Sequence, residues 1–92
     1  MKILVVCGMG IGTSIILKMN TDNALQELGA FADTEASDIS AARGAAAMAD
    51  LVLTSEELVD QLSDVGTPVE VIHNFTDVEE IKSVLVKHVQ EQ

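Results

Sequence analysis

The chain has 92 residues, the length of one small domain, and we expect residues 1–92 to form a single domain. Fifteen acidic and five basic side chains give a net charge of −10, which argues against nucleic-acid binding, because that binding depends on Lys and Arg contacts with phosphates. No stretch approaches the ~20 apolar residues of a membrane span, so no direct membrane insertion is expected, and a single cysteine is typical of a cytoplasmic protein.

Strands and helices are predicted to alternate along the chain. An apolar run over residues 3–6 suits the centre of a parallel sheet, because both faces of such a strand are buried. A glycine-rich loop follows this run. Thr13 and Ser14 are expected to cap a helix over residues 15–28, which stops at Gly29.

The rest of the chain continues the alternation. The next expected elements are a weak edge strand over 31–36, an alanine-rich helix over 40–49 and a strand over 51–53. A capping-box pattern at 54–57 predicts a helix to about residue 63, and a strand over 69–72 follows. Thr76 and Glu79 form a second capping box that begins the last helix, which carries Val78, Ile81, Leu85 and Val89 on one face. This order predicts an α/β fold, a small Rossmann-like four-stranded parallel sheet with helices on both faces. Ligands of such sheets bind beyond the carboxyl ends of the strands, where the glycine-rich loop falls.

That loop is the candidate site. Its glycines let backbone N–H groups turn inward, and the following helix adds unpaired N–H groups and a partial positive charge, so the loop is suited to a phosphate dianion. Cys7 stands at its mouth, where the same groups are expected to lower the pKa of the thiol and make it a nucleophile. The predicted phosphate-binding residues are Gly8, Met9, Gly10, Ile11, Gly12, Thr13 and Ser14. No cofactor is expected, and no ligand spacing implies a metal.

Other loop types fit these residues less well. A Walker loop needs a Lys before Thr13, and the dinucleotide fingerprint needs its third glycine one residue later. Counted from Cys7, the spacing resembles the C-x5-R-[ST] signature of low-molecular-weight tyrosine phosphatases, whose fold is then the expected one, but Thr13 occupies the arginine position. The only Pro follows Thr67 instead of the Asp that those enzymes use as a general acid. Such a site is expected to accept a phosphoryl group and hold it.

Residues 7–14, followed by Ile16, Lys18 and Met19, and residues 49–55 resemble the IIB component of the bacterial phosphoenolpyruvate-dependent sugar phosphotransferase system. The likeness is to its ascorbate/galactitol/lactose type, most of all to the ascorbate-type branch. It implies a phosphotransferase relay in which a phosphohistidine of a IIA protein donates to Cys7. The phosphocysteine then donates to a sugar, with ascorbate or a related compound as one candidate, carried by the membrane transporter IIC. The alternatives are a phosphatase-like hydrolase and a non-enzymatic regulatory binding module in which Cys7 is incidental.

Several side chains outside Cys7 have an ordinary role and a functional one in competition. Met9 and Ile11 are expected at the rim of the loop, where they would contact the phosphoryl donor, or folded inward beneath it. Lys18 is expected to pair with Asp22, with neutralisation of a phosphocysteine or of a partner's acid as the alternative. The remaining candidates are expected at the surface: Arg43, His73, His88, Asp38 and Ser40. The alternative is partner steering for Arg43, proton relay for His73, and a place bordering the loop for Asp38 and Ser40.

Overall fold

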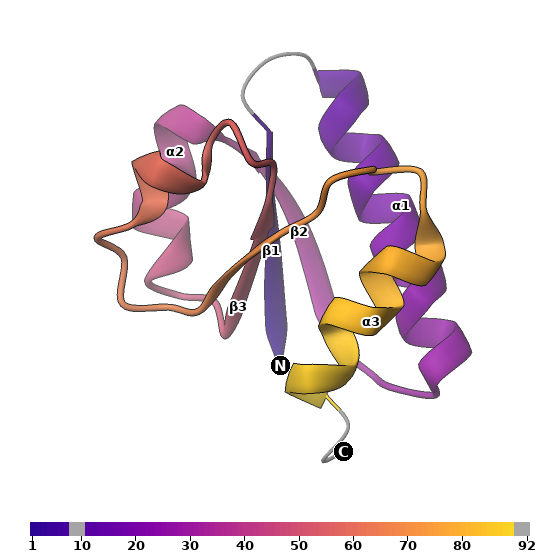
Figure 1. The fold of residues 1–92 in the computed structure, drawn as a ribbon. Helices are drawn as coiled ribbons and strands as arrows, with labels where there is room; N and C mark the ends of the chain where they lie inside the picture. The colour runs from indigo at the N-terminus through magenta and orange to yellow at the C-terminus, as the bar shows by residue number, and fades with distance from the viewer. Residues whose placement is uncertain (8–10, 90–92) are drawn as a thin grey trace.

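The computed structural model describes residues 1–7 and 11–89, and its centre is a parallel sheet (Figure 1). The strands are β1 (Lys2–Cys7), β2 (Asp33–Asp38), β3 (Leu51–Thr54) and β4 (Val69–Val71). They lie in the order β2-β1-β3-β4, and all neighbours run parallel. The predicted four-stranded parallel sheet is confirmed, and the strand order changes direction at β1, beside which the candidate site was expected.

The apolar run of β1 is buried on both sides. Ile3 and Val5 belong to one apolar cluster, Leu4 and Val6 belong to a second, and all four side chains are 0% exposed. Successive side chains of a strand point to opposite faces of the sheet, so a strand covered on both faces needs apolar residues at every position. Burial of each such side chain contributes about 1.5–3 kcal/mol to folding.

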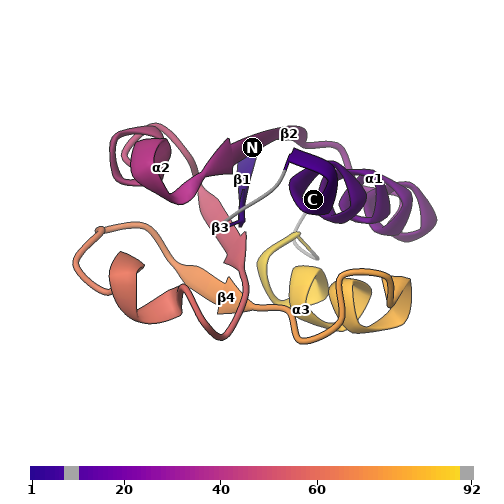
Figure 2. The same ribbon diagram turned by 90° about the horizontal axis from the view of Figure 1, so that it is seen from above.

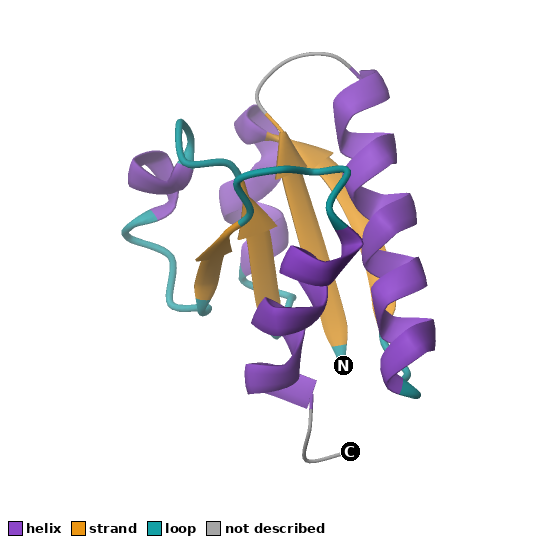
Figure 3. Ribbon diagram, turned by 45° about the vertical axis from the view of Figure 1, so that its right-hand side comes forward, coloured by secondary structure: helices purple, strands orange, loops and turns teal. Residues whose placement is uncertain are grey.

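Helices cover both faces of the sheet, as predicted (Figure 2). α1 (Ile11–Leu28) and α3 (Val78–Val89) pack over the Ile3 and Val5 face, whereas α2 (Ile39–Ala46) and a short 3-10 helix, η1 (Val59–Leu62), belong to the other face. Figure 3 shows the sheet enclosed between these layers. Within residues 1–7 and 11–89 no helix is both long enough and apolar enough to cross a membrane.

The end of α1 is confirmed and its start is corrected. Gly29 has a φ of +70°, and its N–H donates to the carbonyl of Gln26 over 3.1 Å while the N–H of Ala30 donates to the carbonyl of Leu25 over 3.0 Å. This is the left-handed helix end that glycine favours. The backbone of α1 is already helical at Ile11, so Thr13 and Ser14 lie inside the first turn and do not precede the helix as caps.

The helix expected from residue 54 to residue 63 is wrong. Thr54 is the last residue of β3, is buried, and donates its hydroxyl to the carbonyl of Val6 over 3.2 Å. A hydroxyl used between two strands is not available to cap a helix. The chain instead makes a turn, in which the N–H groups of Leu58 and Val59 both donate to the carbonyl of Ser55 over 3.1 Å, and then the four residues of η1.

Other boundaries moved by smaller amounts. β2 begins two residues later than expected because Asp33 pairs with Lys2 and Asp38 with Cys7 along the full length of β1. α3 begins at Val78, and the carboxylate of Asp77 accepts from the N–H of Glu80 over 3.2 Å, so Asp77 caps the helix in place of Thr76. α2 ends at Ala46 and β4 at Val71, each before the predicted end.

Candidate functional site

Cys7 ends β1 at the carboxyl edge of the sheet. Its side chain is 4% exposed, and it pairs in register with Asp38 of β2. On the other side, β1 and β3 are in register with Val5 opposite Leu53, which places Ser55 level with Cys7 two residues further on. The bond from Thr54 to the carbonyl of Val6 joins the two strands just before that point. Cys7 is therefore held between two strand ends.

The predicted phosphate cradle is described only in part. Gly8, Met9 and Gly10 lie outside the described residues, so their predicted part in the cradle, and that of Met9 at its rim, belongs to a segment that is not described. Ile11, Gly12, Thr13 and Ser14 are described by their backbone, which forms the first turn of α1. That turn contains no acidic residue, so no carboxylate there offsets the partial positive charge of the helix N-terminus.

The pKa of Cys7 departs from the sequence prediction. Burial raises the pKa of the Cys7 thiol above its ordinary value, because a thiolate loses its hydration in an apolar environment. The lowered pKa expected from the glycine-rich loop is thus contradicted. The raised pKa favours the protonated thiol.

Asp38 and Ser40 lie near Cys7 but are engaged elsewhere. The carboxylate of Asp38 accepts from the N–H of Ala41 over 3.1 Å and from the hydroxyl of Ser40 over 2.7 Å. The Ser40 hydroxyl, and then the Ala41 N–H, hold the pKa of Asp38 below its ordinary value. Asp38 is therefore an ionised N-cap of α2.

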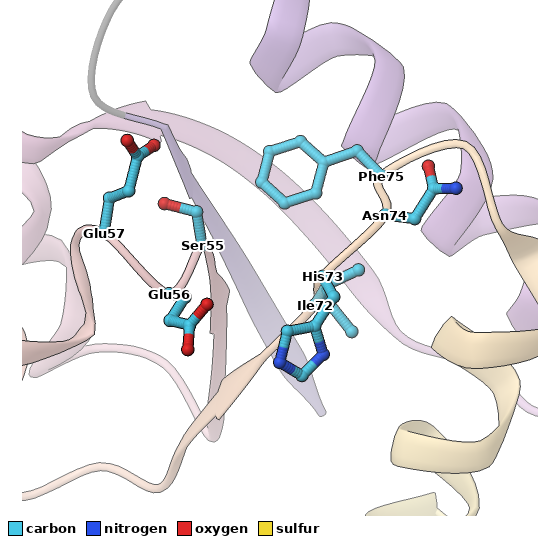
Figure 4. A pocket seen from close by; sticks show the side chains of 7 residues that line it. All are labelled: Ser55, Glu56, Glu57, Ile72, His73, Asn74 and Phe75. Atoms are coloured by element: carbon cyan, nitrogen blue, oxygen red, sulfur yellow. The ribbon is translucent and has the colours of Figure 1, made fainter.

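A pocket of about 380 Å³ opens at the same edge of the sheet, where β3 and β4 end (Figure 4). β3 is the neighbour of β1, which ends at Cys7. In Figure 4 the Phe75 ring faces Ser55 and Glu57 from the opposite side of the gap. The lining residues are Ser55, Glu56, Glu57, Ile72, His73, Asn74 and Phe75. The sequence prediction noted His73 at this edge but missed Ser55, Asn74 and Phe75. Their positions directly after two parallel strands are the signal that could have identified them.

One wall of the pocket is held from two helices. Glu80 of α3 accepts from the N–H of His73 over 2.7 Å and from the N–H of Asn74 over 3.0 Å, and Asn20 of α1 donates to the carbonyl of Phe75 over 2.8 Å. Burial on its own raises the pKa of Glu80, but the bonds from His73 and Asn74 outweigh it and leave this pKa below its ordinary value. The segment from His73 to Phe75 is thus fixed by an ionised carboxylate and an amide.

The remaining candidate residues mostly form ion pairs. Lys18 pairs with Asp22 over 3.2 Å, as predicted. Arg43 is exposed and lies 2.9 Å from Asp64. The Nδ1 atom of His73 is 3.0 Å from Glu80, and the Nε2 atom of His88 is 2.7 Å from Glu70.

His88 is a correction as well. Its side chain is only 22% exposed, so it is not the surface histidine expected from the sequence. Among residues 1–7 and 11–89 no three His, Cys, Asp or Glu side chains are grouped closely enough to hold a metal ion.

An apolar surface lies on the exposed side of α1, in the first half of the helix. Ile15, Ile16 and Met19 are 46%, 43% and 59% exposed, and their spacing places them together on the helix. We call these three residues the α1 patch. The sequence has no acidic residue before Asp22, so the α1 patch and Cys7 belong to the longest acid-free stretch of a strongly acidic chain.

Comparisons with known proteins agree on one family. The family model described as the lactose/cellobiose-specific IIB subunit of the PTS system matches residues 2–87. The chain is 30% identical, over 95% of its length and 93% of the relative, to the ascorbate-specific PTS system EIIB component of Mycoplasma pneumoniae. The lactose-specific IIB component domain from Streptococcus pneumoniae has the same fold, with a TM-score of 0.73 over 96% of both chains at 14% identity.

Proposed function

Since the chain belongs to the IIB family of the sugar phosphotransferase system, we propose that Cys7 is the residue that carries the phosphoryl group. The family has a phosphotransferase role in sugar uptake, and the open question is which atom of this chain accepts the group. The placement of Cys7 supports the proposal: it is the only cysteine, it ends β1 at the carboxyl edge, and α1 begins four residues later. Gly8 to Ser14 are proposed as its phosphate cradle.

The reaction at Cys7 has two balanced steps. In the first, the sulfur attacks the phosphorus of a phosphohistidine on a IIA protein, the P–N bond breaks, and the leaving imidazole takes the thiol proton. This route suits a thiol whose pKa is raised by burial, because no free thiolate has to accumulate beforehand. In the second, a sugar hydroxyl attacks the phosphorus, the S–P bond breaks, and the hydroxyl proton passes to a base of the acceptor complex while the thiolate leaves.

We propose that residues 1–92 form a single cytoplasmic IIB domain, with a IIA protein as donor and a membrane IIC transporter as the second partner. Both partners have to reach Cys7, so their surfaces overlap there and they bind in turn. The printed names of the relatives mention ascorbate and lactose, and these two sugars are the first acceptors to assay.

Mass spectrometry tests the carrier function directly. After incubation with phosphorylated IIA, the chain is expected to gain one phosphoryl group, located on Cys7. Thr13 occupies the position of the phosphatase arginine, and no arginine precedes Arg43, so the phosphocysteine is expected to persist. Rapid hydrolysis of p-nitrophenyl phosphate by the isolated chain would indicate a phosphatase instead, and absence of label with intact IIA would contradict the carrier function.

The α1 patch is proposed to contact the donor protein. An incoming phosphohistidine is anionic, and the α1 patch contains no carboxylate, while that of Asp22 one turn further on is paired with Lys18. Ile16→Asp or Met19→Asp is expected to slow phosphoryl transfer from IIA about tenfold, which corresponds to about 1.4 kcal/mol.

A variant on the same helix controls for added charge. Gln26→Glu places one negative charge on an exposed residue of α1, about 15 Å along the helix from Ile16, and is expected to transfer at the original rate. Transfer kinetics with all three variants provide the measurement. Equal slowing by Gln26→Glu would show that net charge, and not contact with the α1 patch, controls the rate.

A further inference from the structure

The pocket beside Cys7 has a chemistry opposite to that of the α1 patch. Glu56 and Glu57 line it and are both exposed, and within the described part of the chain neither carboxylate forms an ion pair with a Lys, Arg or His. Phe75 supplies an aromatic face, which in Figure 4 is turned toward Ser55 and Glu57. Carboxylates together with an aromatic ring suit a cationic side chain, which is attracted to both.

The pocket is also preformed. Its Phe75 side is held by Glu80 and Asn20, as described above. Its Glu57 side lies within the turn in which the N–H groups of Leu58 and Val59 bond to the carbonyl of Ser55. A ligand that enters a preformed pocket avoids the entropy that would be lost if the loops had to be ordered first.

Charge is distributed unevenly along the sequence, and the α1 patch and the pocket belong to parts of opposite net charge. Residues 1–21 hold two Lys and no acidic residue, and the remaining chain holds three basic and 15 acidic residues, so the parts carry charges of +2 and −12 that sum to −10. The α1 patch belongs to the first part and the pocket to the second. A phosphoprotein is repelled by the pocket, and a basic surface is attracted to it.

We propose that the pocket receives a Lys or Arg side chain from the cytoplasmic face of the membrane IIC partner, an assignment that rests on the proposed function. Cytoplasmic loops of membrane proteins carry an excess of Lys and Arg, so the face that this chain meets at a membrane transporter is basic. The cation is attracted by the carboxylates of Glu56 and Glu57 and by the Phe75 ring across the gap. The donor uses the α1 patch, the acceptor complex uses the pocket, and the two footprints share Cys7.

The test separates the two partners. The double variant Glu56→Gln, Glu57→Gln is measured for binding to IIC in phosphatidylcholine vesicles by sedimentation, with IIC-free vesicles as a blank, and for phosphoryl uptake from phosphorylated IIA. We expect the Kd for the IIC vesicles to rise about tenfold and uptake from IIA to stay within twofold. Binding of the original chain is expected to weaken between 50 and 200 mM salt, and that of the double variant to weaken less.

A matched control has the same net charge as the double variant. Asp33→Asn with Glu35→Gln removes two exposed carboxylates from β2 and is expected to bind the IIC vesicles as the original chain does. An unchanged Kd in the pocket variant, an equal rise in the control, or an equal loss of uptake from IIA would each overturn the pocket assignment. If the original chain takes no phosphoryl group from IIA, the carrier function itself fails, which is a different result.

Discussion

Replacing Cys7 by Ser is expected to abolish phosphoryl uptake from phosphorylated IIA, with a loss on the order of 10³-fold or more, as for removal of other catalytic nucleophiles. A serine hydroxyl is a far weaker nucleophile than sulfur. The measurement is the mass shift of the chain after incubation with the donor.

Two controls accompany this variant. Because Cys7 is 4% exposed, a hydroxyl at this position also has to be accommodated in a buried site, and Cys7→Ala removes the nucleophile without adding a polar group. Thermal unfolding of both variants separates loss of the nucleophile from loss of the fold. Uptake by folded Cys7→Ala at the original rate would exclude Cys7 as the acceptor. Cys7 would then be a buried thiol with no part in the transfer.

Replacing Glu80 by Ala is expected to lower the free energy of unfolding by about 2 kcal/mol, because two backbone N–H groups lose a charged acceptor. For a domain of this size the melting temperature should fall by roughly 10 °C. Glu80→Gln keeps one acceptor oxygen, and its melting temperature is expected to lie between those of the original chain and of Glu80→Ala. Glu79→Ala removes the neighbouring carboxylate, whose contact with Lys82 is exposed, and should change stability by less than about 0.5 kcal/mol.

The effect of Glu80 is also expected to depend on pH. Its pKa is lower in the folded protein than its ordinary value, so its contribution is complete above the pKa of about 4.3 that a free Glu has. The contribution is lost as the pH falls through the lower folded-state pKa. Melting curves of the original chain and of Glu80→Ala should therefore converge below about pH 4. A constant difference down to pH 2 would mean that the carboxylate is not the stabilising form.

The sequence was sufficient for the central features of the fold. An unbroken apolar run such as that of β1 can be buried only between two layers, and Gly29 follows a helix at the position where a left-handed residue is favoured. The pairing of Lys18 with Asp22 depends only on helical spacing. These are local relations, and each can be read within one segment of the chain.

Features that depend on distant segments were not accessible in this way. Thr54 looked like a helix cap because its other partner, the carbonyl of Val6, is 48 residues away in the sequence. The pocket combines residues that follow β3 with residues that follow β4. The pKa of Cys7 was misjudged because the loop suggested stabilising N–H groups, whereas burial beneath the surrounding layers acts in the opposite direction.

Asn20 connects the α1 patch with the wall of the pocket. It follows Met19 of the α1 patch directly, and its amide donates to the carbonyl of Phe75 in the wall of the pocket. Any displacement of this part of α1 therefore acts on the position of the Phe75 segment. In thermodynamic terms, a ligand of one surface that changes the affinity of the other surface for its own ligand must itself be affected by the same factor, because such coupling is reciprocal. This one hydrogen bond between a helix and a loop thus makes the α1 patch and the pocket wall parts of one connected unit.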